Sequence, residues 1–379
     1  MKKILVLGGY GNIGQVVIKD LIDSGFFVGI AGRDNYKIDN FIKKLKGNNY
    51  EKVIIDLKNE LSLMEIFKKY DLVVNCLEYT YNQVILDLCI KTGKNYVDLG
   101  DDYNGIKTSI SKNSLAKKNK ITACLGAGSS PGIVNILTKY AVKEMKKIET
   151  ITISFSDEIK NTPKNMLPFN FATVVEEILG DALVFEDGKY KFVKGSTVRI
   201  DADFCRIGTD NNSCLLPGSY ITNHDEQLSL PDYLKEKGIQ NVYFVMKHSE
   251  NVISLVKSLN EFGFLDKQKI NIKGVEISPF EFTNMIMSKF APQNFLVDDK
   301  ESLFIKLDEK IVEIVNYSVD GVPAGVVNTG IGCSLISQYI SNNNLARGVH
   351  HPEDLVNDKW FINELKKRKF EIYIDGKNI

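Results

Sequence analysis

The stretch Gly8-Gly9-Tyr10-Gly11-Asn12-Ile13-Gly14 follows a short apolar run at residues 4–7 and leads into a helix-like pattern. A turn that holds a diphosphate between a strand and a helix needs one glycine for the tight bend. It needs a second that leaves room for the phosphates, and a third that lets helix and strand touch. Glycines 9, 11 and 14 meet this GxGxxG spacing, and the amides and dipole of the helix would hold the phosphate oxygens. The stretch therefore predicts a dinucleotide-binding turn, with contact residues Gly9, Tyr10, Gly11, Asn12, Ile13 and Gly14.

The sequence after this turn alternates short apolar runs with helix-period segments, the pattern typical of parallel strands joined by crossover helices. The expected strands are residues 4–7, 26–31, 53–57, 72–77, 96–99 and 121–125. Gly25 and Gly93 stand where two of the intervening helices should stop. Six such strands predict an α/β domain of the Rossmann type, with a doubly wound parallel sheet.

A second domain is expected because 379 residues exceed what one hydrophobic core usually supports. After residue 147 the pattern changes to polar–apolar alternation, with strand-like pieces at 190–193 and 242–246 and a hairpin over 303–315. These pieces predict an α+β domain with a mixed, largely antiparallel sheet, whose broad face is a candidate dimer surface. The expected boundaries are 1–130 for the Rossmann domain, 131–329 for the substrate and dimerisation domain, and 330–379 for a segment that completes the first domain. The basic run 366–368 in this last segment is expected to be a solvated helix end.

Composition excludes several classes of protein. The 48 acidic and 48 basic residues balance, which does not favour a nucleic-acid partner. No stretch approaches the ~20 apolar residues of a membrane helix, and the amino terminus does not resemble a signal peptide, so we expect a cytoplasmic protein. The six cysteines are scattered, and adjacent residues such as His350 and His351 point opposite ways on an extended chain, so no metal site is expected.

The end of the second strand bears on the choice of cofactor, because a carboxylate there binds the ribose hydroxyls of NAD and repels the 2′-phosphate of NADP. Gly32 stands at this position, and Arg33 follows with a guanidinium suited to a phosphate. Asp34 is either the ribose-binding acid, after a shift of one residue, or the cap of the next helix. We expect NADP, with NAD as the alternative. Further cofactor contacts are expected where later strands end, at Asp56, Cys76 and Leu77, although plain packing explains the last two equally well.

Several motifs together resemble the saccharopine dehydrogenase family, and the likeness extends over most of the chain. They are Gly8-Gly9-Tyr10-Gly11 with Ala31-Gly32-Arg33, Asp71-Leu72-Val73-Val74-Asn75, Gly93-Lys94-Asn95-Tyr96-Val97-Asp98, Gly126-Ala127-Gly128, Pro131-Gly132-Ile133-Val134-Asn135, His224-Asp225-Glu226 with Leu230-Pro231, Gly321-Val322-Pro323-Ala324-Gly325 and Gly348-Val349-His350-His351-Pro352-Glu353. Within the family, the chain resembles lysine 6-dehydrogenases and saccharopine reductases. The resemblance implies a homodimer, a discontinuous Rossmann domain and an amine-bearing, amino-acid-like substrate. Ser129-Ser130 departs from the family pattern, so the identity of the substrate does not carry over.

Oxidation of an amine or reduction of an imine by a nicotinamide needs a group that manages the proton on nitrogen. Asp98 ends the fifth strand and is the first candidate, because crowding by Asp101 and Asp102 would raise its pKa; alternatively this cluster caps the next helix. His224 with Glu226 is the second candidate, and a structural histidine is the alternative.

The substrate carboxylate needs a cation. Arg199 and Arg206 are candidates because only five arginines occur among the basic residues, and a guanidinium binds a carboxylate in bidentate fashion. Asp101 is a further candidate for substrate binding, and either arginine alternatively serves a subunit interface.

Two functions follow from these residues. The first is an NAD(P)-dependent oxidoreductase that acts on the C–N bond of an amino acid or amino-acid adduct, such as lysine or a saccharopine-like compound. The alternative is a non-catalytic Rossmann dimer that senses the dinucleotide. A complete second domain with charged clusters favours the enzyme.

Overall fold

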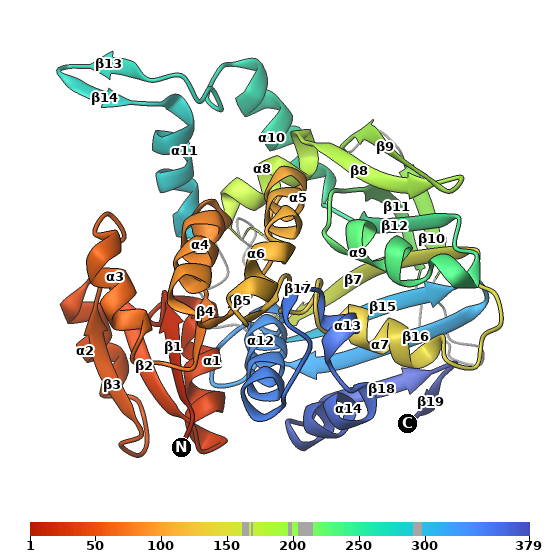
Figure 1. Ribbon diagram of the computed structural model, residues 1–379. Coiled ribbons are helices and arrows are strands. Elements are labelled where there is room, and N and C mark those ends of the chain that lie inside the picture. Colours follow the sequence, from red (N-terminus) through yellow and green to blue (C-terminus); the bar gives the residue numbers. More distant parts are fainter. Residues whose placement is uncertain (161–166, 168–169, 196–198, 204–214, 291–297) are drawn as a thin grey trace. The chain divides into compact units, whose positions relative to one another are not determined.

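The computed structural model describes residues 1–160, 167, 170–195, 199–203, 215–290 and 298–379 (Figure 1). The chain forms two compact units, each assembled from three segments. Unit 1 comprises Met1–Lys146, Leu228–Glu236 and Gly325–Phe370, and unit 2 comprises Lys147–Gln227, Lys237–Ala324 and Glu371–Ile379. Contact density therefore divides the chain at residue 146 rather than 130, and it assigns the last nine residues to unit 2.

Unit 1 contains a seven-stranded parallel sheet in the order β17-β6-β5-β4-β1-β2-β3. Its strands are β1 (Lys3–Leu7), β2 (Phe27–Gly32), β3 (Tyr50–Ile54), β4 (Leu72–Asn75), β5 (Asn95–Asp98), β6 (Thr122–Cys124) and β17 (Gly348–His350). The direction of winding reverses between β1 and β4, and ligands of such sheets bind at the carboxyl ends of the strands beside this reversal. The predicted Rossmann sheet is confirmed.

Three strands of unit 1 differ from the sequence-based expectation, and one of them is β4, which ends at Asn75 rather than at residue 77. β3 ends at Ile54 and not at residue 57, because it is an edge strand whose side chains are all at least partly exposed, so hydrophobicity does not mark its ends. β17 was not predicted, since its three residues are too few to show a period of two.

Helices cover the sheet of unit 1. They are α1 (Asn12–Asp23), α2 (Asn35–Ile42), α3 (Glu60–Phe67), α4 (Asn82–Thr92), α5 (Tyr103–Ser111), α6 (Asn113–Lys118), α7 (Ile133–Ala141), α12 (Ala324–Asn342), α13 (Pro352–Leu355) and α14 (Asp358–Lys367). Fully buried apolar side chains such as Leu5, Phe67, Val73 and Tyr96 form one core between sheet and helices. This core fixes the positions of the strand ends, and therefore of the loops that follow them at the carboxyl edge of the sheet.

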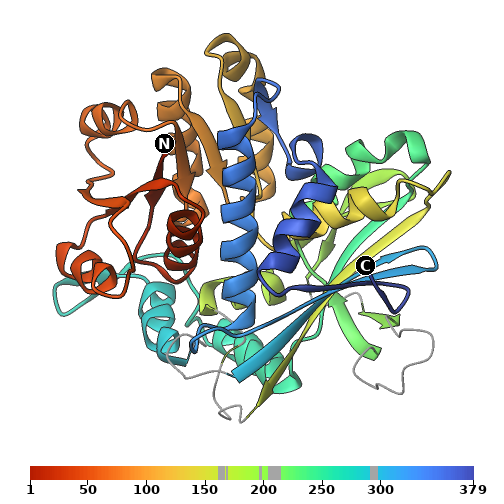
Figure 2. The same ribbon diagram turned by 90° about the horizontal axis from the view of Figure 1, so that it is seen from below.

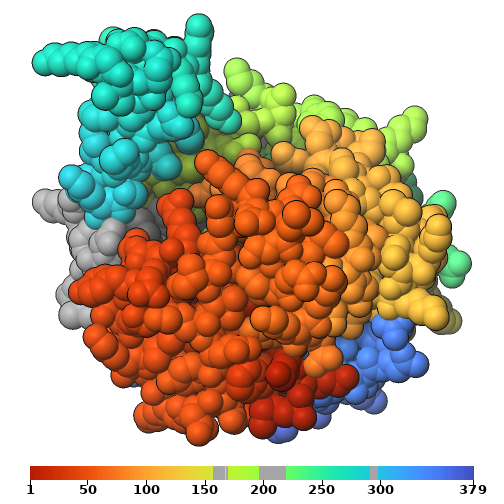
Figure 3. Space-filling model, turned by 60° about the vertical axis from the view of Figure 1, so that its left-hand side comes forward, coloured from red at the N-terminus to blue at the C-terminus, as the bar shows by residue number. Residues whose placement is uncertain are grey.

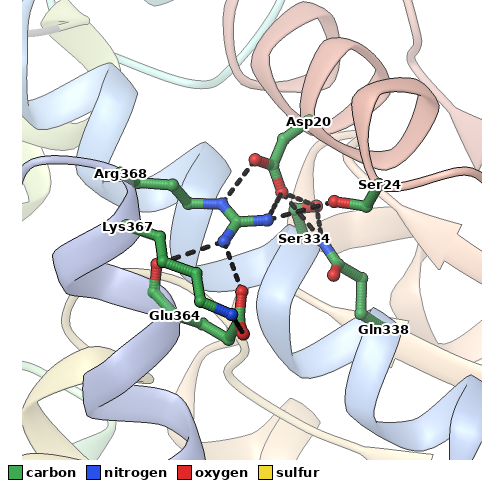
Figure 4. Close-up of polar contacts among 7 residues, drawn as sticks. All are labelled: Asp20, Ser24, Ser334, Gln338, Glu364, Lys367 and Arg368. Carbon is green, nitrogen blue, oxygen red and sulfur yellow. Dashed lines mark hydrogen bonds and ion pairs between the residues drawn. The ribbon is translucent and has the colours of Figure 1, made fainter.

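The carboxyl-terminal helices pack onto the first helix of the chain, as Figure 2 shows for α12 and α1. A Cβ atom at Gly330 of α12 would meet the side chain of Val16 in α1. At the end of α14, the guanidinium of Arg368 binds both carboxylate oxygens of Asp20 in α1 (Figure 4). The expectation of a solvated basic helix end is therefore wrong for Arg368, whose side chain is 16% exposed, because Asp20 pairs with it.

Unit 2 is built on a mixed sheet of ten described strands, in which β12 and β7 are parallel and the other pairs are antiparallel. Its strands are β7 (Thr150–Lys160), β8 (Asp181–Glu186), β9 (Lys189–Lys194), β10 (Arg199–Asp203), β11 (Leu215–Ile221), β12 (Asn241–Met246), β15 (Asp298–Leu307), β16 (Lys310–Tyr317), β18 (Glu371–Ile374) and β19 (Lys377–Asn378). The predicted hairpin is β15–β16, and the mixed, largely antiparallel sheet is confirmed.

The helices of unit 2 are α8 (Phe171–Leu179), α10 (Glu250–Glu261) and α11 (Pro279–Met287), while α9 (Glu226–Tyr233) begins in unit 2 and continues into unit 1. A separate two-stranded hairpin, β13 (Ile270–Ile272) with β14 (Val275–Ile277), lies between α10 and α11 along the chain. Within the described ranges, no helix combines the length and the apolar character that a membrane crossing requires.

Candidate active site

The turn after β1 leaves no room for side chains at two of its glycines. Gly8 has a φ of +72°, and a Cβ atom there would lie 2.8 Å from the carbonyl oxygen of Cys76. A Cβ atom at Gly14 would collide with the carbonyl oxygen of Gly8. The amide of Gly9 donates to Ala31 at 3.0 Å, and the amide of Gly11 donates to Gly8 at 2.8 Å. Local backbone bonds and close packing thus hold the turn in one conformation.

This turn presents the amino terminus of α1 at the carboxyl edge of the sheet. Gly11 is the N-cap, and no side chain forms a capping hydrogen bond with this helix. The first-turn amides of Asn12 and Ile13 and the helix dipole are therefore available to an anion. These groups fit the diphosphate of a dinucleotide.

The end of β2 carries a ring and two basic side chains. A Cβ atom at Gly32 would overlap the ring of Tyr10, so this ring occupies the place of a side chain at the strand end. Arg33 is exposed, and the ammonium of Lys37 lies 5.8 Å from the centre of the Tyr10 ring. Asp34 is the N-cap of α2, where its carboxylate accepts from the amide of Lys37 at 3.0 Å. Of the two roles considered for Asp34, the structure therefore shows the helix cap.

The other predicted cofactor residues follow the ends of their strands. Asp56 is exposed two residues beyond β3 and accepts from the amide of Lys58 at 2.9 Å. Cys76 and Leu77 are half-buried after β4, and the amide of Cys76 donates to Leu7 of β1 at 3.1 Å. All three lie at the same edge of the sheet as the glycine turn.

Asp98 ends β5 at this edge and is 1% exposed. Its Oδ1 atom accepts from the amides of Gly126 at 2.8 Å and Gly100 at 3.1 Å. Burial raises the pKa of Asp98 to about 7, and the nearby charge of Asp101 adds to the shift, although the two amides oppose it. Asp98 is therefore a carboxyl group that gains or loses a proton near neutral pH.

The neighbouring acids have different contacts. Asp102 caps α5 by accepting from the amide of Gly105, so the helix-cap alternative holds for Asp102 and not for Asp98. Asp101 accepts from the side chain of Asn82 at 3.2 Å, and partial burial raises its pKa. Asp101 therefore stays next to Asp98 as a second, more accessible carboxylate.

In unit 2, His224 and Glu226 form an ion pair, with 2.7 Å between His224 Nδ1 and Glu226 Oε2. The imidazole stacks on Phe244 of β12, with 3.7 Å between ring centres. Burial lowers the pKa of His224, but attraction and hydrogen bonding by Glu226 outweigh it, so the pKa is raised overall. Since Glu226 is fully buried, its carboxylate stabilises the protonated form of the ring.

A second histidine–carboxylate pair in unit 2 was not predicted. His248, which follows β12, lies 3.3 Å from Glu177 of α8, measured between Nε2 and Oε2, and both residues are buried. Burial raises the pKa of Glu177, while His248 and His224 oppose that shift. The position of His248 just after a predicted strand was a usable signal, but nothing in the sequence around Glu177 marked it.

Of the two arginines predicted to bind the substrate carboxylate, the structure describes only one. Arg199 begins β10 in unit 2, and Arg206 lies outside the described residues. In the part of the chain that the structure covers, no three His, Cys, Asp or Glu side chains are arranged to hold a metal ion.

Two family comparisons cover nearly the whole chain. Residues 4–125 match the saccharopine dehydrogenase NADP binding domain, and residues 128–370 match the saccharopine dehydrogenase C-terminal domain. The apo structure of saccharopine dehydrogenase (L-Glu forming) from Saccharomyces cerevisiae has the same fold, with a TM-score of 0.72, 14% identity and 100% of both chains covered.

Two curated relatives add sequence similarity. A carboxynorspermidine synthase from Vibrio cholerae is 24% identical over 310 residues, which cover 72% of this chain and 70% of that protein. A carboxyaminopropylagmatine dehydrogenase from Synechocystis is 22% identical over 312 residues, which cover 77% and 73%. With the glycine turn in place and both family domains matched, the chain belongs to the saccharopine dehydrogenase family and is an NAD(P)-dependent oxidoreductase.

Proposed function

We propose that the chain acts on the C–N bond of an amine that carries a carboxylate, with NADP as its cofactor. The substrate class comprises amino acids and amino-acid adducts, including lysine and saccharopine-like compounds. The names of the two curated relatives describe carboxylated polyamines, which belong to the same chemical class. Ser129-Ser130 leaves the choice within this class open.

The proposal of NADP is supported by the end of β2. Gly32 offers no carboxylate to the ribose, and the carboxylate of Asp34 is engaged as a helix cap. Lys37 lies beside the Tyr10 ring, and Arg33 follows Gly32 directly at the end of β2, so a 2′-phosphate at this strand end would gain bidentate and electrostatic contacts.

The buried carboxyl group of Asp98 is the feature of the structure that best supports the proposed reaction. A bound nicotinamide supplies or accepts the hydride at the carbon atom of the C–N bond. The nitrogen atom must lose a proton when the amine becomes an imine and regain it in the reverse direction. A buried carboxyl group with a pKa of about 7 serves both directions at neutral pH.

The remaining candidate residues have proposed roles that follow from their charge. His224, held by Glu226, is proposed as a second group that transfers a proton, because the carboxylate raises its pKa. Arg199 and Arg206 are proposed as partners of the substrate carboxylate, and Asp101 as a partner of its amine.

The test is reduction of NADP by the purified chain with saccharopine, carboxynorspermidine or lysine. Norspermidine is the matched control, because it keeps the polyamine skeleton and lacks the carboxylate. We expect turnover with at least one carboxylated amine and none with norspermidine. Tight NADPH binding without turnover of any amine would instead support the dinucleotide-sensing alternative.

A further inference from the structure

A buried polar network surrounds the carboxyl group of Asp98. It consists of Asn75 at the end of β4, Asn82 at the start of α4 and Tyr96 in β5, each at most 2% exposed. Asn75 lies opposite Asp98 in the pairing of β4 with β5, and Tyr96 lies two residues before Asp98 on the same face of β5. Figure 3 shows, in orange, the surface that α3, α4 and their neighbours in sequence form on one face of unit 1, and burial keeps the network inside the unit.

The hydrogen bonds of the two asparagines fix the direction of each side-chain amide. Asn82 donates through Nδ2 to the carbonyl oxygen of Gly100 at 2.8 Å and to Asp101 at 3.2 Å. Asn75 accepts from the amide of Leu77 at 3.2 Å through Oδ1, and it donates through Nδ2 to Asn82 Oδ1 at 2.8 Å. Turning either amide over would bring oxygen against oxygen and donor against donor. Neither asparagine can therefore change the direction of its hydrogen bonds.

The hydroxyl of Tyr96 is the member of this network that can turn. It donates to Asn82 Oδ1 at 3.3 Å, and it also lies within reach of the Asp98 carboxyl, where a hydrogen bond from it favours the charged form. Rotation about its C–O bond exchanges these two partners without moving the ring. Because Asn82 Oδ1 keeps the donor from Asn75, the exchange leaves no acceptor unpaired.

We propose that Tyr96 is a positioning residue for proton transfer, whose hydroxyl turns from Asn82 to Asp98 when Asp98 passes its proton to the substrate nitrogen. This inference rests on the proposed function of Asp98. Two backbone amides bind Asp98 Oδ1, which leaves Oδ2 as the oxygen that carries the proton. A hydrogen bond to a charged acceptor is roughly twice as strong as one to a neutral acceptor, so the hydroxyl follows the charge.

Among the described residues, three other ionisable side chains interact with Tyr96 or Asp98. Cys89 of α4 and Cys124 of β6 are fully buried, and burial raises the pKa of both thiols, so they stay uncharged at neutral pH. Asp101 is more accessible, and its negative charge favours the protonated form of Asp98. A hydroxyl that donates to Asp98 therefore opposes both the charge of Asp101 and the effect of burial.

Titration of Asp98 in the free chain tests this inference without a substrate. When aspartate is labelled with ¹³C at its side-chain carboxyl, the signal that is missing from Asp98→Asn identifies Asp98, and its dependence on pH gives the pKa. Tyr96→Phe removes only the hydroxyl, so we expect this pKa to rise by about one pKa unit, because the carboxylate loses a donor. Tyr70→Phe is the matched control and should leave the titration unchanged. It removes a buried hydroxyl that donates to Glu51 at 2.8 Å and precedes β4, at the opposite edge of the sheet.

The pH profile of turnover gives a second measurement. In the oxidation of a carboxylated amine, kcat/KM depends on the base form of Asp98 in the free enzyme, so Tyr96→Phe should lower it by up to about 10-fold at about pH 6 and by less than about twofold at about pH 9. The affinity for NADPH should not change. A raised pKa combined with full turnover in Asp98→Asn would refute the proton-transfer role of Asp98 and not its contact with Tyr96.

Asn82→Ala keeps the test decisive if Tyr96→Phe does not fold. Without Asn82 as a competing acceptor, the hydroxyl of Tyr96 donates to Asp98 at all times, so the pKa of Asp98 should fall. Thermal melting by circular dichroism verifies that each variant is folded. An unchanged or lowered pKa in folded Tyr96→Phe would overturn the inference, and so would a raised pKa in folded Asn82→Ala.

Discussion

Arg33 owes its proposed role to its place directly after a strand that ends in glycine. Because its exposed guanidinium is available to a 2′-phosphate, we expect Arg33→Ala to raise the dissociation constant of NADPH by ~10–100-fold, as for a lost charge-assisted pair. NADH lacks this phosphate, so its affinity should change by less than about threefold. Isothermal titration calorimetry with both nucleotides checks the difference. Lys46→Ala, an exposed charge in the loop after α2, is the control, and equal losses for both nucleotides would exclude the phosphate contact.

Asp98 combines full burial with two backbone donors, and asparagine retains an acceptor oxygen for both amides. We therefore expect Asp98→Asn to lower kcat by ~10²–10⁴-fold while the affinity for NADPH stays unchanged, since only proton transfer is removed. Steady-state kinetics with whichever carboxylated amine is turned over, together with NADPH titration, measures both quantities. Unchanged turnover would assign Asp98 a structural role at the end of β5.

The pKa of Asp98 also predicts how stability depends on pH. In the folded chain the carboxyl keeps its proton up to about pH 7, whereas the unfolded chain releases it near 3.8, so folding binds a proton between these values. The contribution of Asp98 to stability therefore falls as pH rises through this window and is lowest above pH 7. The variant Asp98→Asn does not titrate. Its free energy of unfolding relative to wild type should thus increase from about pH 4 to pH 8 by up to on the order of 4 kcal/mol, at 1.36 kcal/mol per pKa unit. Urea denaturation across this range measures the change, and a difference that stays constant with pH would contradict the raised pKa.

At the scale of elements, the ion pair of Arg368 joins three helices that are distant in sequence. Asp20 of α1 also accepts from Ser334 at 2.6 Å and Gln338 at 2.8 Å, both on α12, and Glu364 of α14 binds the guanidinium at 2.9 Å (Figure 4). Arg368→Met would leave Asp20 largely buried without its cation, so we expect a loss of about 2–3 kcal/mol, below the range for fully buried pairs. Thermal or urea unfolding measures this loss. Lys366→Met, an exposed neighbour in the same basic run, should change stability by less than about 0.5 kcal/mol.

Elements with clear local patterns were predictable, and elements decided by distant contacts were not. The glycine turn, β1, β4 and the hairpin β15–β16 follow from apolar periods and turn residues that lie within a few positions of each other. β17 pairs with β6 more than 200 residues earlier, and β3 is half-exposed, so neither has a local pattern that marks its limits. The same reason explains why the pair His248–Glu177 was missed: its two residues meet only after α8 packs near the end of β12.

At the scale of the whole molecule, the carboxyl-terminal segment supplies a strand and buried side chains to unit 1. Phe361, Ile362 and Leu365 of α14 are buried there, and β17 extends the sheet. We expect a chain that ends at Asn344 to lose its cooperative thermal transition and its NADPH affinity, because this burial and the Arg368 pair are removed together. Differential scanning calorimetry and nucleotide titration measure both. A chain that ends at Gly376 lacks only β19 and should behave as the wild type; cooperative melting of the shorter chain would show that residues 345–379 are dispensable for unit 1.

The dinucleotide-binding turn, the alternation of strands and helices, the mixed second sheet and the family could all be predicted from the amino-acid sequence, because periodicity and turn geometry depend on neighbouring residues. The folded structure shows Asp34 and Asp102 as helix caps, and the packing of distant segments buries Asp98 with a raised pKa and pairs Arg368 with Asp20. Burial and ion pairing depend on segments that are far apart along the chain. The pKa of a side chain and its exposed fraction are therefore set only when those segments pack together.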